Sequence, residues 1–133
     1  MPARARPLSP HLQVYRWQIS NTLSILHRLT GAVLSIGLVA LVAWILAVAA
    51  GAGAYGRTMR LLGGPLGELL LAGAAFSFFY HLLNGVRHLA WDAGYWFGRR
   101  ERHASGWFVV AGAFALTALA WLLAAHLGGS NHG

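Results

Sequence analysis

Three long apolar runs constrain the fold of this chain more than any other feature. They cover residues 29–50, about 66–89 and 106–127. Each is long enough for an α-helix to cross the hydrocarbon core of a bilayer, which takes about 20 residues. Only 10% of all residues are charged, against roughly 25% in an ordinary soluble domain. We therefore expect an all-α integral membrane bundle of three transmembrane helices.

The spacing of these runs predicts a single domain over residues 1–133. We expect a polar N-terminal segment at about 1–20 and transmembrane helices at about 22–50, 66–91 and 105–127. Because a long polar segment precedes the first run, we expect no secretory signal peptide. The alanine- and glycine-rich residues 49–56, followed by Gly63-Gly64-Pro65, indicate the connection between the first two helices. The absence of cysteine excludes disulfides and thiolate metal ligands.

The arginines predict the orientation of the helices. Eight of them precede or open the first helix or flank the second connection, and only two lie in the first connection. Because cytoplasmic loops carry the excess of basic residues, we expect the N-terminus in the cytoplasm and the C-terminus outside. Topology thus accounts for the basic charge without a nucleic-acid partner. The eight are Arg4, Arg6, Arg16, Arg28, Arg87, Arg99, Arg100 and Arg102, and the two are Arg57 and Arg60.

Polar residues inside an apolar helix are costly, so a stripe of them on the second helix is informative. Its members recur at helical spacing: Ser77, His81, Asn84 or Gly85, His88 and Asp92. Gly85, one turn beyond His81, would leave room for a flat ring such as a porphyrin beside the imidazole. The stripe is typical either of haem ligation or of a helix–helix contact made by small and polar residues.

A second polar cluster, Ser24, His27 and Arg28, lies at the inner end of the first helix. Antiparallel helices would place it at the depth of Arg87 and His88. Together these residues predict a polar pocket that suits a membrane-soluble ligand with a polar head. Alternatively, an arginine at a cytoplasmic helix entrance serves only as a topology signal or as a snorkelling anchor.

Three segments, in this order, carry a resemblance to a known family. They are RPLSPHLQVYR at residues 6–16, SILHRLTG at 24–31 and HLLNGVRHLAWD at 81–92. Together they closely resemble the cytochrome b556 subunits of succinate dehydrogenase, the larger membrane anchors of respiratory complex II. The resemblance covers about residues 6–95 by motif, whereas the third helix is matched by hydropathy alone.

The resemblance implies that the chain binds haem b jointly with a second small anchor subunit. His81 corresponds to the axial ligand of the haem iron, and His27, Arg28 and His88 correspond to residues around the haem and its propionates. Since propionates attract cations, Arg87 is expected on the same side.

The resemblance also implies part of a site for ubiquinone or menaquinone, formed by Ser24, Arg28 and Asp92. A hydroxyl and a guanidinium can hold a quinone carbonyl and stabilise developing negative charge. Asp92, near the aqueous boundary, either relays protons or forms an ion pair with Arg87 or Arg16.

A further implication is that the chain works in a complex with an iron–sulfur subunit and a flavoprotein. Electrons would pass from the iron–sulfur subunit to quinone, in a bacterial inner membrane rather than a mitochondrial one. The chain has no flavin fingerprint and no cluster cysteines, so it is not expected to catalyse the reaction alone. Two alternatives stay open: a haem-free structural or assembly anchor, and a small transporter or channel.

The depth of His81 bears on the second haem ligand. His81 precedes His88 by seven residues, which is roughly 10 Å at 1.5 Å per residue. The first helix is expected to reach that depth near residues 34–36 and the third near 112–113, where neither offers a histidine or methionine. His27 and His88 are expected to lie too shallow. We therefore expect the second axial ligand to come from another chain.

Overall fold

The computed structural model describes residues 17–129, and within that range every regular element is a helix. The elements are α1 (Ile19–Ala49), α2 (Ala52–Leu62), α3 (Pro65–Asp92) and α4 (Arg99–Gly129). Helices α1, α3 and α4 are long and apolar enough to cross a membrane, which confirms the expected all-α architecture with three spans. The RPLSPHLQVYR segment, with Arg6 and Arg16, and also Arg4 lie outside the described residues.

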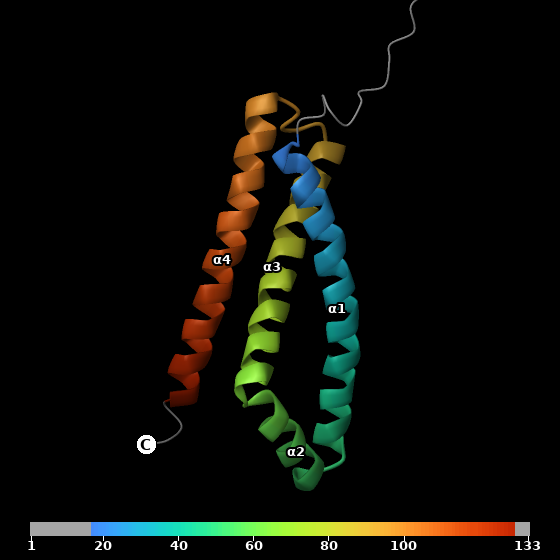
Figure 1. Ribbon diagram of the computed structural model, residues 1–133, viewed down its shortest axis with the longest axis vertical. Coiled ribbons are helices and arrows are strands. Elements are labelled where there is room, and N and C mark those ends of the chain that lie inside the picture. Colours follow the sequence, from blue (N-terminus) through green and yellow to red (C-terminus); the bar gives the residue numbers. More distant parts are fainter. Residues whose placement is uncertain (1–16, 130–133) are drawn as a thin grey trace, which may run out of the picture.

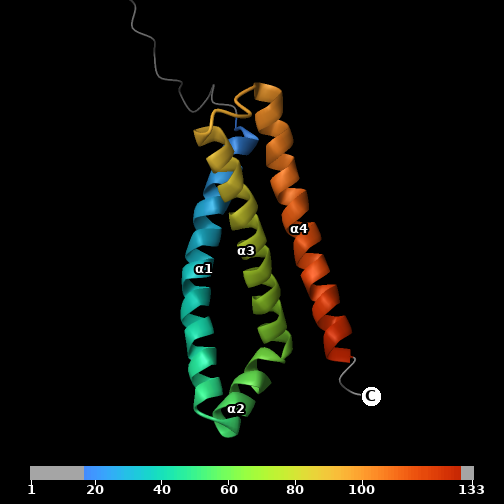
Figure 2. The same ribbon diagram turned by 180° about the vertical axis from the view of Figure 1, so that it is seen from behind.

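Helix α3 lies between α1 and α4 and packs against both (Figure 1 and Figure 2). The small core consists of Leu23, Tyr80, Val109 and Ala113. These residues come from the first part of α1, the second half of α3 and the first half of α4, so the core lies toward the end where α1 begins. Beyond Thr30, α1 has no buried residue. The bundle is therefore closely packed at one end and loosely packed at the other.

The connection between α1 and α3 contains a helix that the glycine-rich sequence did not indicate. The chain breaks at Gly51, whose φ of 97° favours a residue without a Cβ, and α2 follows at once. Its apolar residues and two arginines give α2 an amphipathic character, and none of its residues is buried. Alanine, leucine and arginine favour a helix strongly enough to outweigh the two glycines inside it.

Helix α4 begins at Arg99, earlier than the expected start near residue 105. The additional turn is charged and lies outside the apolar run, so hydropathy did not reveal it. A carboxylate oxygen of Glu101 accepts a hydrogen bond from the backbone N–H of Gly98 at 3.1 Å. This bond satisfies a backbone donor at the start of the helix.

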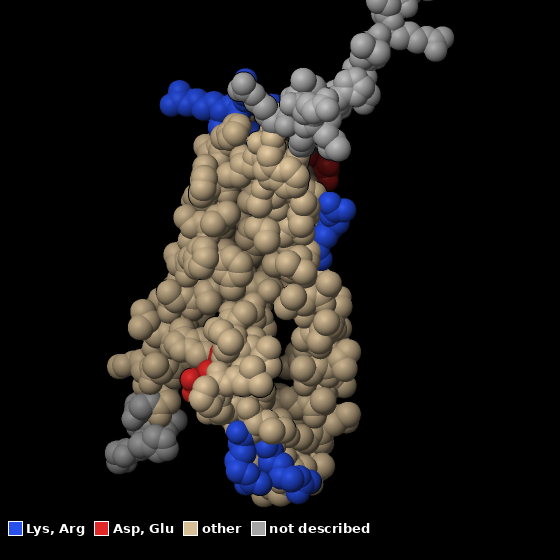
Figure 3. All heavy atoms as spheres, in the orientation of Figure 1, with Lys and Arg blue, Asp and Glu red and all other residues tan. Residues whose placement is uncertain are grey.

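The arginines gather at the two ends of the bundle, and most of the surface between them is uncharged on the face that Figure 3 shows. Arg57 and Arg60 lie on α2, and Arg99, Arg100 and Arg102 lie in the first turn of α4. These two groups are at opposite ends of the long helices. The separation agrees with the charge pattern from which orientation was predicted, and the orientation itself stays a prediction.

The first turn of α3 tests the packing at the α2 end. A Cβ at Gly67 would lie 2.5 Å from the backbone oxygens of Leu61 and Leu62, whereas one at Gly73 would meet nothing within 4 Å. We expect Gly67→Ala to lower the free energy of unfolding by about 1–3 kcal/mol, because neither backbone oxygen can move easily. Gly73→Ala should be neutral or stabilising by up to about 1 kcal/mol. Thermal unfolding in detergent micelles measures both, and equal midpoints would contradict the prediction.

Candidate histidine site between α1 and α3

A buried tyrosine aligns α3 with α1. The Tyr80 side chain is fully buried, and its hydroxyl donates a hydrogen bond to the backbone oxygen of Leu23 at 2.9 Å. Because the interface is buried, a hydroxyl and a backbone oxygen that were not bonded to each other would stay without a partner, which would destabilise the fold. The bond therefore fixes which residues of the two helices face each other.

Next to Tyr80, the imidazole of His81 contacts the α1 backbone. Its Nδ1 lies 3.2 Å from the backbone oxygen of His27 and 3.3 Å from the hydroxyl of Thr30. Because a carbonyl oxygen can only accept, these partners assign the proton to Nδ1. Within residues 17–129, the other ring nitrogen, Nε2, makes no hydrogen bond. A neutral imidazole held in this way is the form that binds a metal.

Two more histidine rings complete the cluster. The His27 ring stacks on the His81 ring, with centroids 4.0 Å apart and planes 9° from parallel. The His88 ring lies 5.4 Å from that of His27, and its Nε2 lies 3.4 Å from the amide nitrogen of Asn84. The Nδ1 of His27 is buried and has no hydrogen-bond partner among the described residues. The structure thus brings together His27, His81 and His88, although the sequence predicted that His27 and His88 lie shallower than His81.

The expected depth of His27 was wrong. His81 was expected to face residues 34–36 of α1, with His27 too shallow to reach it. Instead His81 lies against His27, Thr30 and Gly31. The depth count set residues 28 and 88 level with each other. The structure instead places the backbone oxygen of His27 and the hydroxyl of Thr30 beside the His81 ring, so the two helices pair in a different register.

The predicted quinone residues are open to their surroundings. Ser24 and Arg28 lie one turn apart on α1, on either side of His27 in the sequence, and both are exposed. Asp92 is the last residue of α3 and is also exposed. No hydrogen bond or ion pair within the described part of the chain joins Asp92 to Ser24 or Arg28. The structure thus leaves Ser24 and Arg28 available and does not link Asp92 to them.

Arg87 takes a position that the sequence did not predict, because its guanidinium points toward α4. Its Nε donates to the Ser105 hydroxyl at 2.9 Å, and its Nη2 donates to the backbone oxygen of Arg102 at 3.1 Å. The guanidinium also lies 4.0 Å from the centre of the Trp91 ring. The ion pair considered between Arg87 and Asp92 is absent from the described residues, and Arg16 lies outside them. Arg87 therefore joins α3 to α4.

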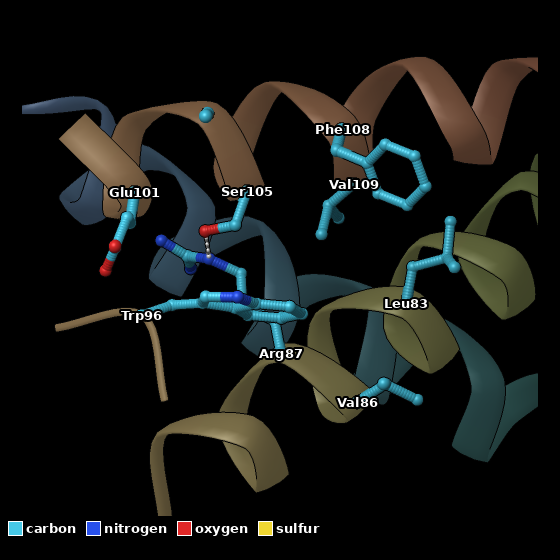
Figure 4. Close-up of a pocket in the computed structure, with 9 residues that line it drawn as sticks. Leu83, Val86, Arg87, Trp96, Glu101, Ser105, Phe108 and Val109 are labelled. Carbon is cyan, nitrogen blue, oxygen red and sulfur yellow. Dashed lines mark hydrogen bonds between the residues drawn. The ribbon is translucent and has the colours of Figure 1, made fainter. Parts of the chain in front are cut away.

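A cavity of about 510 Å³ adjoins this bond between α3 and α4. Figure 4 shows Arg87 bonded to Ser105 at its polar end, near Trp96 and Glu101. Apolar side chains form the remaining walls: Leu83, Val86, Phe108 and Val109. Among the described residues, no histidine and no residue of α1 lines this cavity. Asn84 and Trp91 on α3 each contact both Arg87 and His88, so they lie between the cavity and the histidine site.

Comparison with known proteins decides the family. Residues 2–120 match the model of the succinate dehydrogenase/fumarate reductase transmembrane subunit. The chain belongs to this family. It is 41% identical over 117 residues to the succinate dehydrogenase cytochrome b556 subunit of Rickettsia felis, with 88% of this chain and 91% of the relative covered.

Two further relatives extend the similarity. The cytochrome b556 subunit of Paracoccus denitrificans is 40% identical over 114 residues, covering 86% of this chain and 88% of the relative. The cytochrome b560 subunit of Reclinomonas americana is 39% identical over 123 residues, covering 89% and 85%. These matches confirm the resemblance drawn from the three motifs, and they extend it into the third membrane span.

Sequence reasoning missed three residues of the site. Thr30 and Gly31 contact the His81 ring, and Tyr80 fixes the helix register. Thr30 could have been found, because it is a polar residue one turn after His27 in an apolar run. Gly31 and Tyr80 gave no such signal, because glycine and tyrosine are common in membrane helices for other reasons.

Arg87 provides a stability test for the contact between α3 and α4. The residue is only 3% exposed, and Arg87→Ala would remove its bonds to Ser105 and Arg102 and enlarge the adjoining cavity. We expect a loss of roughly 2–4 kcal/mol in the free energy of unfolding. The exposed Arg100, changed to Ala, should stay within about 0.5 kcal/mol of the parent. The thermal unfolding midpoints of the two variants are compared with that of the parent. An unchanged midpoint in Arg87→Ala would show that these hydrogen bonds do not contribute to stability.

Proposed function

We propose that this chain is the cytochrome b anchor subunit of a succinate:quinone oxidoreductase. In this role it binds haem b through His81 and forms part of the quinone-reducing site. One observation carries the proposal: in a member of this family, His81 forms its hydrogen bonds within residues 17–129 through Nδ1, which leaves Nε2 free for a metal. Bound haem supplies a one-electron redox centre, which the side chains of this chain lack.

The residues around His81 fit a haem. A Cβ at Gly85 would meet no atom within 4 Å, so the space one turn beyond His81 is open, as the sequence predicted. The Nδ1 of His27 is a buried polar atom without a partner in the described part of the chain, so it is available to a bound group. The exposed guanidinium of Arg28, one residue away, suits a propionate. His27, Arg28 and His88 would therefore hold the edge of the group that His81 ligates.

The stacking of the two rings argues against His27 as the second ligand of the same iron, and in favour of a ligand from a partner subunit. Ligands on opposite faces of one iron must direct their nitrogens toward each other. The His27 and His81 rings lie face to face, 9° from parallel, and cannot do so. For His27, this reason replaces the depth argument. It supports a haem shared with another small membrane subunit.

Ser24 and Arg28 suit the quinone site because both are exposed and without hydrogen bonds in the described part of the chain. A hydroxyl and a guanidinium one turn apart can donate to the same carbonyl oxygen, and they favour the form that carries negative charge. Asp92 would contribute as a proton relay at the helix end. The quinone would be ubiquinone or menaquinone.

The remaining elements of the proposal concern the assembly and its membrane. The partners are the second anchor subunit, an iron–sulfur subunit and a flavoprotein, with the cytoplasmic face at the end where α1 begins. The cytochrome b556 relatives from Rickettsia and Paracoccus support a bacterial inner membrane. Succinate oxidation would occur on the soluble subunits, and this chain would hold the sites at which electrons reach quinone.

The haem assignment is tested by His81→Ala in the whole complex. We expect the reduced-minus-oxidised absorption spectrum to lose its b-type band, because among residues 17–129 no other imidazole has one nitrogen bonded to a neighbouring helix and the other free. Succinate oxidation by an artificial dye, which accepts electrons before the membrane site, should survive. His103→Ala removes an exposed histidine and should leave the spectrum unchanged. A full b-type band in His81→Ala would refute the assignment, and a band absent from the parent would favour a haem-free anchor.

The quinone assignment is tested by Ser24→Ala and Arg28→Ala. We expect quinone-linked activity to fall about tenfold or more, as the loss of one hydrogen bond to a charged group predicts. Dye-linked activity should stay near the parental value. Ser35→Ala is a matched control, because the Ser35 hydroxyl bonds to the Gly31 backbone of its own helix at 2.9 Å. Equal losses of both activities would indicate failed assembly and withdraw support from the site.

A further inference from the structure

Thr30 is a buried residue with a contact that its own helix does not require. The side chain is 5% exposed, and the hydroxyl donates to the backbone oxygen of Leu26 at 2.8 Å or of His27 at 3.0 Å. Such bonds to the preceding turn are ordinary for threonine in membrane helices. The same oxygen, however, also lies 3.3 Å from Nδ1 of His81 on α3. With its proton directed at the backbone, it presents lone pairs to the Nδ1 proton.

The backbone oxygen of His27 is reachable because of Gly31. In an α-helix each side chain leans back over the preceding turn. A larger residue at position 31 would cover the His27 carbonyl, one turn earlier. A Cβ at Gly31 would also lie 3.1 Å from Cε1 of His81. The glycine thus leaves space for the His81 ring and access to the carbonyl that it bonds.

The stacked ring of His27 limits the rotation of His81 from another direction. With centroids 4.0 Å apart, the two rings are in contact, so His81 cannot turn about its Cβ–Cγ bond without displacing His27. His27 therefore contributes both its backbone oxygen and its ring. Three neighbouring residues of α1 together determine where the proton of His81 lies and how its ring is oriented.

We propose that His27, Thr30 and Gly31 form a seat on α1 for the His81 imidazole, in which Thr30 is a positioning residue for the haem ligand. The proposal rests on the proposed binding of haem by His81. Two acceptors at Nδ1 make the imidazole a stronger electron donor through Nε2, and they fix its tautomer and orientation. The seat thereby sets the reduction potential of the haem as well as holding the ligand.

The decisive variant is Thr30→Val, which replaces the hydroxyl by a methyl group of similar size. In the purified complex we expect the haem to be retained and its midpoint potential to shift upward, because a weaker donor stabilises the ferric form less. The highest g value of the low-spin haem in the electron paramagnetic resonance spectrum should shift as well. Thr30→Ser, which keeps the hydroxyl, should match the parent in both measurements.

Thr117 provides a matched control on α4, where its hydroxyl makes the same kind of bond to the Ala113 backbone at 2.7 Å. Thr117→Val should leave potential and spectrum unchanged. Gly31→Ala should shift the spectrum, because the new Cβ displaces the His81 ring. Dye-linked succinate oxidation reports assembly, and Thr30→Ala takes the place of Thr30→Val if the latter fails to assemble.

Two outcomes would overturn the seat. One is a Thr30→Val complex in which the haem midpoint potential and the electron paramagnetic resonance spectrum equal those of the Thr117→Val control. The other is an equal change in Thr30→Val and Thr30→Ser, since packing of the methyl group and not the hydroxyl would then be responsible. Retention of the b-type band in His81→Ala would refute the haem assignment itself. If that band is lost in His81→Ala but Thr30→Val changes neither the midpoint potential nor the spectrum, only the seat is refuted.

Discussion

The hydrogen bond between Nδ1 of His81 and the backbone oxygen of His27 is the contact on which the arrangement of the site depends. In a bilayer the backbone groups of each helix form their hydrogen bonds within that helix, and a side-chain donor needs an acceptor within the protein because no water is available. A carbonyl that already serves its own helix can accept a second bond only where the next turn leaves it uncovered. Gly31 meets that condition, so a polar ring can be held in an apolar environment without a charged partner.

Helix α3 separates two kinds of polar contact. Toward α1 it presents His81 and His88, whose rings lie near that of His27, and Ser24 and Arg28 on α1 are exposed. Toward α4 it presents Arg87, which is almost fully buried and whose bonds go to the chain itself. One face is thus available for ligands and partner subunits, and the other makes the bundle rigid enough to hold it.

Hydropathy and motif order predicted the three long helices and the family. They did not predict α2, because glycines are read as turns even where alanine and leucine outweigh them, or the charged first turn of α4. They also placed His27 too shallow and Arg87 on the wrong side of α3. The two errors have different causes. The depth count assumed the wrong register between α1 and α3, whereas spacing along a helix does not give the direction in which a long side chain such as Arg87 extends.

The uneven packing of the bundle affects how the protein fits membranes of different thickness. The apolar run at residues 29–50 is about 33 Å long, so a bilayer whose hydrocarbon core departs from about that thickness is mismatched to it. Such a mismatch is relieved by tilting or by local deformation of the bilayer. Beyond Thr30, α1 has no buried residue to resist a change of tilt, whereas the histidine end is tied to α3. Adjustment to the lipid is therefore confined to the far half of the helix, and the histidine geometry is insulated from it.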